Sequence, residues 1–191
     1  ITALETQQIV ALTSAQVAGM TTAQIAALET HQIAAIETLD IRALTSAQVA
    51  ALTTEQAQAL TAAQVAALET ADLRALSTSA FGTFSSEQLA ALTTAQTAGL
   101  TTGQLRALST EQITQLDNAD VAALTTAQLI TLTTDQVAAL TSDQIVAMTG
   151  AQVASLTTAQ VSNLEDDQVA ALTTTQITTL SVEQVGAMTS T

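Results

Sequence analysis

The sequence predicts an all-α solenoid in which one short capped helix forms in every eight-residue repeat. Three observations lead to this fold class. The 191 residues can be written in eights without a gap or an insertion, apolar residues recur at two positions of each octad, and a Thr-x-x-Gln pattern recurs at its start. We take Thr45–Leu52 as the type octad and number its positions one to eight.

The octad has a fixed apolar pattern. Position eight is always apolar, position five is nearly always Val, Ile or Leu, and positions six and seven are mostly Ala. Position four is Gln almost throughout. The departures are Ala57, Phe81 and Thr97 at position five, and Asp40, Asp72, Asp120 and Ala80 at position four.

This period excludes long regular elements. In a strand, positions five and eight would lie on opposite faces, because side chains alternate with a period of two. In a continuous helix, eight residues turn through about 800°, so the apolar stripe would drift by about 80° in each repeat. A short helix in each octad therefore remains as the prediction.

The start of each octad carries a helix signal. In a capping box, a Thr hydroxyl accepts the amide of the third helical residue, and the Gln there bonds back to the Thr amide. Thr45 with Gln48 and Thr133 with Gln136 fit this pattern. Where position one is Glu, as at Glu29, we expect the next residue, Thr30, to cap instead.

A single octad buries too little apolar surface to offset the entropy lost on ordering it. Neighbouring octads must therefore cover one another, as in other solenoids, and Ala at positions six and seven lets adjacent turns approach closely. We expect one repeat array over residues 1–191, with about 23 octads. Both ends fall inside a repeat, so we expect the chain to be an excerpt of a longer protein.

A longer period of 32 residues overlies the octads in residues 1–108. Arg42, Arg74 and Arg106 mark it, and residues 12–44 resemble residues 44–76. Either four octads complete whole turns of the solenoid, which would align the three Arg residues, or the period records gene duplication. We favour duplication.

The octad at residues 77–84 is the degenerate one, because it lacks the Gln and contains both aromatic residues, Phe81 and Phe84. It is either a bend or docking point, or a core octad with larger side chains. Because both Phe residues occupy apolar positions, we expect the core octad.

Charge and composition exclude several classes of function. The formal net charge is −14 and only three Arg residues are basic, so no basic surface exists for nucleic acid. Thr and Gln interrupt every apolar run before it reaches the roughly 20 residues of a membrane span, so no membrane insertion is expected.

No catalytic, cofactor-binding or metal-binding residue is predicted, and we do not expect an enzyme or a cofactor. His31 is the only His, at an exposed position three, and no base accompanies the many Ser and Thr residues. The best carboxylate clusters, residues 165–167 and 117–120, match no calcium-binding loop. We expect solvated acidic surface there.

Octads of the Leu-Thr-Thr-Ala-Gln type, seen at Leu92–Leu100, Leu124–Leu132 and Leu172–Leu180, resemble the repeat tracts of large RTX-like or adhesin-like bacterial proteins. The resemblance implies a spacer, stalk or scaffold in a secreted or cell-surface protein and supplies no active-site residues. Its partners would be neighbouring domains of the same protein.

A second function remains open. The regular Thr residues could form a binding array for ice or polysaccharide, or the chain could self-associate into a filament, because an uncovered solenoid end exposes core. An outward row of Thr hydroxyls would favour the binding array, whereas hydroxyls used in helix caps would favour the spacer.

Overall fold

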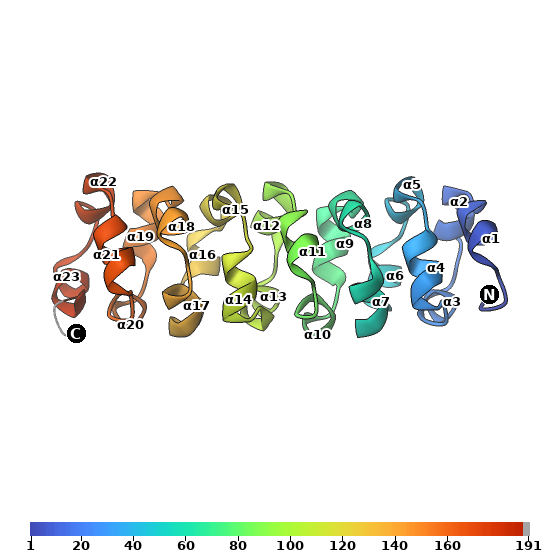
Figure 1. The fold of residues 1–191 in the computed structure, drawn as a ribbon, viewed down its shortest axis with the longest axis horizontal. Helices are drawn as coiled ribbons and strands as arrows, with labels where there is room; N and C mark the ends of the chain where they lie inside the picture. The colour runs from blue at the N-terminus through green and yellow to red at the C-terminus, as the bar shows by residue number, and fades with distance from the viewer. Residues whose placement is uncertain (189–191) are drawn as a thin grey trace. The chain divides into compact units, whose positions relative to one another are not determined.

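The computed structural model describes residues 1–188, which are helical with no strand and hold one short helix in each octad (Figure 1). The predicted fold class is confirmed. The chain divides into two compact units, the first covering residues 1–100 and the second starting at residue 101. Each unit is described by itself.

The helices of both units are four to seven residues long. In the first unit they are α1 Thr6–Val10, α2 Ser14–Ala18, α3 Thr22–Ala26, α4 Thr30–Ala35, α5 Thr38–Ile41, α6 Ser46–Ala50, α7 Thr54–Ala59, α8 Ala62–Ala67, α9 Thr70–Ala75, α10 Thr78–Phe81, α11 Ser86–Ala90 and α12 Thr94–Gly99. In the second unit they are α13 Thr102–Ala107, α14 Thr110–Thr114, α15 Asn118–Ala123, α16 Thr126–Leu129, α17 Thr134–Ala138, α18 Ser142–Ala147, α19 Gly150–Ser155, α20 Thr158–Val161, α21 Asp166–Ala171, α22 Thr174–Ile177 and α23 Val182–Met188.

Capping boxes start most of these helices, as predicted. In α6 the Gln48 amide donates to Thr45 Oγ1 at 3.3 Å, and the Thr45 amide donates to Gln48 Oε1 at 2.8 Å. Thr45 has φ −86° and ψ 157°, an extended conformation that ends one helix and begins the next. The described residues contain no positive φ angle, so the chain turns without the left-handed conformation that Gly favours.

The prediction for octads that begin with Glu is wrong in one respect. Glu29 itself is the N-cap of α4, and Thr30 is the first helical residue. The Glu29 amide still donates to Gln32 Oε1 at 2.9 Å, so the half of the box that Gln supplies is kept. A carboxylate at this place also interacts favourably with the positive end of the helix dipole.

Helices stack on the helix three octads further along, as α4 does on α7 in the first unit and α18 on α21 in the second (Figure 1). Positions five and eight form the core between them. Val49, Val65 and Val137 are completely buried, and Leu68 is 3% exposed. Burial of this apolar surface is the main favourable contribution to the fold.

The stacking also bears on the period of 32 residues. Arg42 follows α5, which packs with α8, whereas Arg74 belongs to α9, which packs with α6. Helices three octads apart pack together, whereas position-four glutamines bond to carbonyls four octads earlier, so four octads do not complete a whole number of turns. This geometry favours duplication over an alignment of Arg residues.

The degenerate octad is part of the core, as expected. Phe81 is completely buried and Phe84 is 2% exposed. Their ring centroids lie 4.9 Å apart with 43° between the planes, within the range of favourable aromatic pairs.

Neighbouring turns are in close contact where position seven of one octad meets position two of the octad three before it. A Cβ atom on Gly99 would lie 2.1 Å from Cγ2 of Thr70. The same arrangement joins Thr179 to Gly150, with the Thr179 hydroxyl donating to the Gly150 carbonyl at 3.0 Å. Small residues at these positions therefore set the spacing between turns.

We expect Gly99→Ala to lower the free energy of unfolding by about 1–3 kcal/mol, because the added methyl overlaps Thr70 in a packed interface. Thermal and urea unfolding followed by circular dichroism measure the change. Thr70→Ala in the same chain should restore stability. Gly186→Ala is the control, since its Cβ would meet nothing within 4 Å. A loss in the control as large as that of Gly99→Ala would contradict the prediction.

Candidate functional site

The position-four Gln joins two helices with one side chain. Gln64 shows the arrangement: its Oε1 accepts the Thr61 amide at 2.8 Å, within its own octad. Its Nε2 donates to the carbonyls of Ile33 and Ile36 at 2.9 and 2.7 Å, in the octad four before it. Gln64 is only 2% exposed.

This arrangement recurs along both units, and we call it the glutamine ladder. Its members donate from Nε2 to backbone carbonyls 28 to 31 residues earlier. In the first unit they are Gln32, Gln48, Gln56, Gln64, Gln88 and Gln96, and in the second Gln136, Gln144, Gln152, Gln160, Gln168, Gln176 and Gln184.

The ladder supplies hydrogen-bond donors for backbone carbonyls that short helices leave unpaired. The last carbonyls of an α-helix have no partner within the helix, and a buried carbonyl without a partner is costly. In this chain each helix contains only one or two turns, so such carbonyls make up a large share of its backbone. The Gln amide supplies their donor.

Sequence reasoning predicted the capping half of this interaction and missed the half that links turns. One signal was present. A capping box accepts either Glu or Gln at its third helical residue, yet Glu never occurs at position four. Only Gln provides an acceptor for the cap and a donor for the next turn.

Asp replaces Gln at two positions of the first unit, and each Asp has a serine partner. Ser14 Oγ donates to Asp40 Oδ1 at 2.6 Å, and Ser46 Oγ donates to Asp72 Oδ1 at 2.5 Å. Asp40 is 4% exposed and Asp72 is 8% exposed. Both pairs are 26 residues apart, and each lies inside one of the duplicated segments.

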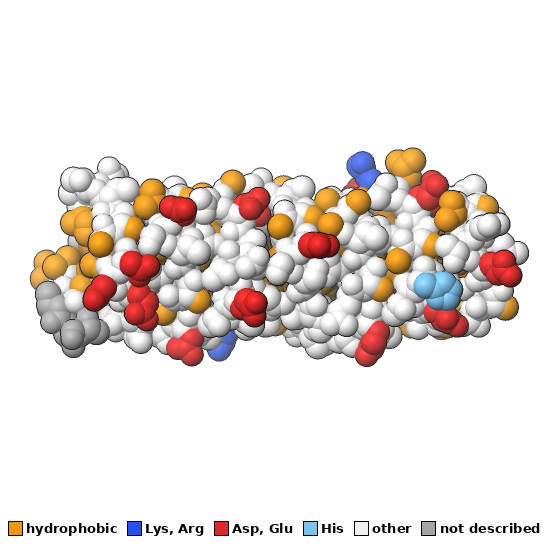
Figure 2. Space-filling model, viewed as in Figure 1, with side chains coloured by type: hydrophobic (Ala, Val, Ile, Leu, Met, Phe, Trp, Pro, Cys, Tyr) orange, Lys and Arg blue, Asp and Glu red, His pale blue; other side chains and the backbone are white. Residues whose placement is uncertain are grey.

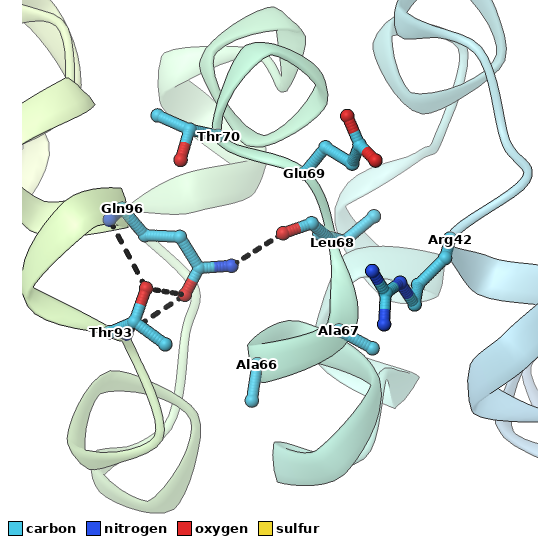
Figure 3. A pocket seen from close by; sticks show the side chains of 8 residues that line it. All are labelled: Arg42, Ala66, Ala67, Leu68, Glu69, Thr70, Thr93 and Gln96. Carbon is cyan, nitrogen blue, oxygen red and sulfur yellow. Dashed lines mark hydrogen bonds between the residues drawn. The ribbon is translucent and has the colours of Figure 1, made fainter.

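A hollow of about 380 Å³ lies in the first unit, lined by the α8–α9 junction, Arg42, Thr93 and Gln96 (Figure 3). Figure 3 shows the Arg42 side chain extending toward this junction, where Glu69 also lies. The Thr93 hydroxyl is hydrogen-bonded to Gln96, whose Nε2 donates to the Leu68 carbonyl at 2.7 Å. Thr93 and Gln96 in the hollow thus belong to the cap and the ladder, whereas Arg42 belongs to neither.

His31 lies on the surface, as its position in the octad predicts. Its side chain is 55% exposed, and its Nδ1 is 3.3 Å from Oε2 of Glu29. With the residues around it, Glu5, Thr6 and Gln7, it borders a surface hollow of about 360 Å³.

The two carboxylate clusters differ in structure. Residues 165–167 are exposed, whereas Asp120 in the other cluster is 2% exposed. Asp167 Oδ1 accepts the Gln168 amide at 2.9 Å, beside the start of α21. Over the described residues, no group of three His, Asp or Glu side chains is placed to hold a metal ion.

Acidic side chains are spread over the visible face rather than gathered into one patch (Figure 2). Some of these carboxylates accept hydrogen bonds at the start of a helix. The pKa of Glu55 is lowered, first by its own backbone amide and then by the hydroxyls of Thr53 and Thr54.

Among the described helices, none has the length and apolar character needed to cross a bilayer.

Comparison with known families identifies the repeat. The sequence model of the ALTTAQ repeat matches five times, at residues 1–36, 33–70, 65–102, 113–150 and 146–174. These matches cover most of the chain. No curated protein matches it.

We expect Gln64→Glu to lower the free energy of unfolding by about 2–4 kcal/mol, because a buried carboxylate would face two carbonyls without a donor. The cap is kept, since Glu also accepts the Thr61 amide. Urea unfolding measures the loss. Gln16→Glu is the matched control, because Gln16 is exposed and bonds to Thr13 alone. Equal losses at the two positions would refute the role of the turn-to-turn bonds.

We expect Ser46→Ala to cost about 1–2 kcal/mol, because Asp72 loses its donor while remaining buried. Asp72→Gln should cost less, since a Gln there regains the ladder geometry toward the octad at residues 37–44. A double-mutant cycle in urea measures the coupling. A coupling energy near zero would show that the hydrogen bond contributes nothing to stability.

Proposed function

The chain belongs to the ALTTAQ repeat family and is a structural repeat region, and we propose that it works as a spacer or scaffold in a secreted or cell-surface bacterial protein. The observation that carries this proposal is the use of the polar side chains. Position-one hydroxyls accept helix amides, and position-four amides link turns. The recurrent polar side chains of the octad thus form hydrogen bonds within the fold.

The same observation weighs against a Thr array as a binding surface. Such a surface needs hydroxyls in a regular outward row, but those of Thr61, Thr93 and Thr133 accept amides of their own helices. The Thr residues at position two form no uniform outward row, because Thr94 and Thr126 are exposed whereas Thr70 is half-buried against another turn. The caps therefore favour the spacer.

A spacer also needs to stay soluble without partners along its length. The net charge of −14 keeps copies apart by mutual repulsion. In this proposal the partners are the neighbouring domains of the same large protein. The resemblance to RTX-like and adhesin-like repeat tracts supports an extracellular location for these domains.

We expect small-angle X-ray scattering to give a radius of gyration well above the value of about 16 Å for a compact domain of this length. Removing residues 45–76 keeps the octad phase and takes away 32 of 191 residues. The maximum dimension of a spacer should then fall by about one sixth, since its length grows with the number of repeats. A radius near 16 Å, or a dimension unchanged by the deletion, would contradict the spacer.

A further inference from the structure

Asp72 occupies a ladder position with the opposite hydrogen-bonding character to Gln. In the ladder, Gln64 Nε2 donates to the position-eight carbonyl of Ile36 at 2.7 Å, 28 residues earlier. At the octad of Asp72, the corresponding carbonyls are those of Ile41 and Leu44. A carboxylate supplies acceptors where Gln supplies a donor, so acceptors meet acceptors here. We call Ile41, Leu44, Asp72 and the serine bonded to it the aspartate step.

The aspartate step is buried and has no positive group of the chain beside it. Asp72 is 8% exposed and Leu44 is 4% exposed. Among the described residues, no donor bonds to the Leu44 carbonyl, and no Arg nitrogen lies within 4.0 Å of the Asp72 carboxylate. Ser46 supplies one hydroxyl hydrogen bond to Asp72 Oδ1. That single bond leaves the charge of a buried carboxylate, beside two carbonyl oxygens, without a counter-charge.

The length of the side chain leaves room for an ion in the aspartate step. Asp is shorter than Gln by one methylene, about 1.5 Å, so its carboxylate reaches less far toward the carbonyls. A cation can bridge oxygens that lie beyond hydrogen-bond distance of each other, because it contacts each of them at roughly 2–3 Å. Hard cations take oxygen ligands, and backbone carbonyls replace the hydration shell of monovalent cations in channel filters.

The same set of groups occurs one 32-residue copy earlier. Asp40 is 4% exposed and accepts the Ser14 hydroxyl at 2.6 Å. Its position in the octad corresponds to the carbonyls of Ile9 and Leu12, and within the described residues no donor bonds to the Leu12 carbonyl. Whatever balances the charge at Asp72 should therefore also act at Asp40.

We propose that each aspartate step binds one monovalent metal cation, Na⁺ or K⁺, between the Asp carboxylate and the carbonyls of the octad four before it. At the inner step the ligands are the oxygens of Asp72, Ser46, Ile41 and Leu44. One carboxylate among neutral oxygens carries one negative charge, which a monovalent cation neutralises, whereas a divalent cation would leave a costly buried positive charge. The ion thus links two turns, as Gln Nε2 does elsewhere.

The first experiment measures thermal unfolding of the intact chain by circular dichroism in NaCl, KCl or tetramethylammonium chloride at one ionic strength. The organic cation screens surface charge but is too large to enter between two turns. We expect the melting temperature to be at least about 3 °C higher in the better alkali salt. Equal melting temperatures in all three salts overturn the proposal. The spacer function does not depend on this outcome, because it concerns the length of the single chain.

Calcium chloride at the same ionic strength tests the charge of the ion. It should raise the melting temperature no more than the better alkali salt does, because a divalent ion leaves the step with a net positive charge. A clearly larger rise in calcium would overturn the assignment to a monovalent cation.

The double variant Asp40→Gln with Asp72→Gln tests the site. It removes both carboxylates and restores the Gln donors, so it should fold and lose at least half of the alkali-dependent shift. Its control, Glu55→Gln with Glu87→Gln, removes the same charge from exposed positions of the same unit and should keep the shift. An undiminished shift in the double variant, or an equal loss in the control, would assign the effect to surface charge and overturn the proposal.

A crystal structure of the intact chain, grown in the better alkali salt, locates the ion. We expect an ion bound only by oxygens, including those of Asp72 and Leu44. A water molecule that donates hydrogen bonds to these two groups would show that hydration completes the step, and would overturn the proposal.

Discussion

The glutamine side chain at position four supplies hydrogen-bond partners that a fold made of very short helices would otherwise lack. Such helices leave unpaired amides at their starts and unpaired carbonyls at their ends. Gln64 accepts the amide that begins its own helix and donates to the carbonyls of Ile33 and Ile36 in an earlier turn. Local helix formation and stacking of turns are therefore coupled through a single amide, and the apolar core of positions five and eight closes around it.

Where the glutamine is absent, the structure substitutes another arrangement. Asp40 and Asp72 accept from serines on a neighbouring turn, and the octad of Ala80 contributes two buried phenylalanines in contact. A carboxylate cannot donate a hydrogen bond to carbonyls, and the alanine side chain forms no hydrogen bond. These octads rely on a serine donor or on additional apolar volume.

The fold was predictable because its signals are local. The Thr-x-x-Gln box, the Ala-rich positions and the i, i+3 spacing of positions five and eight all operate within one octad. The turn-to-turn bonds were not predicted, because their partners depend on how many octads complete a turn, which no single octad specifies. The cap at Glu29 was misplaced for a different reason: residue preference favoured Thr30, whereas the backbone geometry, which repeats in every octad, keeps the cap at position one.

The two Ser–Asp pairs bear on how such an array can change in length. Ser14 and Asp40 lie within one 32-residue copy, and Ser46 and Asp72 within the next. Gain or loss of a whole copy therefore carries both partners together and leaves each buried carboxylate with its donor. Loss of a single octad between them would separate the partners and leave a carboxylate buried without one. Selection for stability alone would thus favour growth of the gene in steps of four octads, even though the chain folds in units of one.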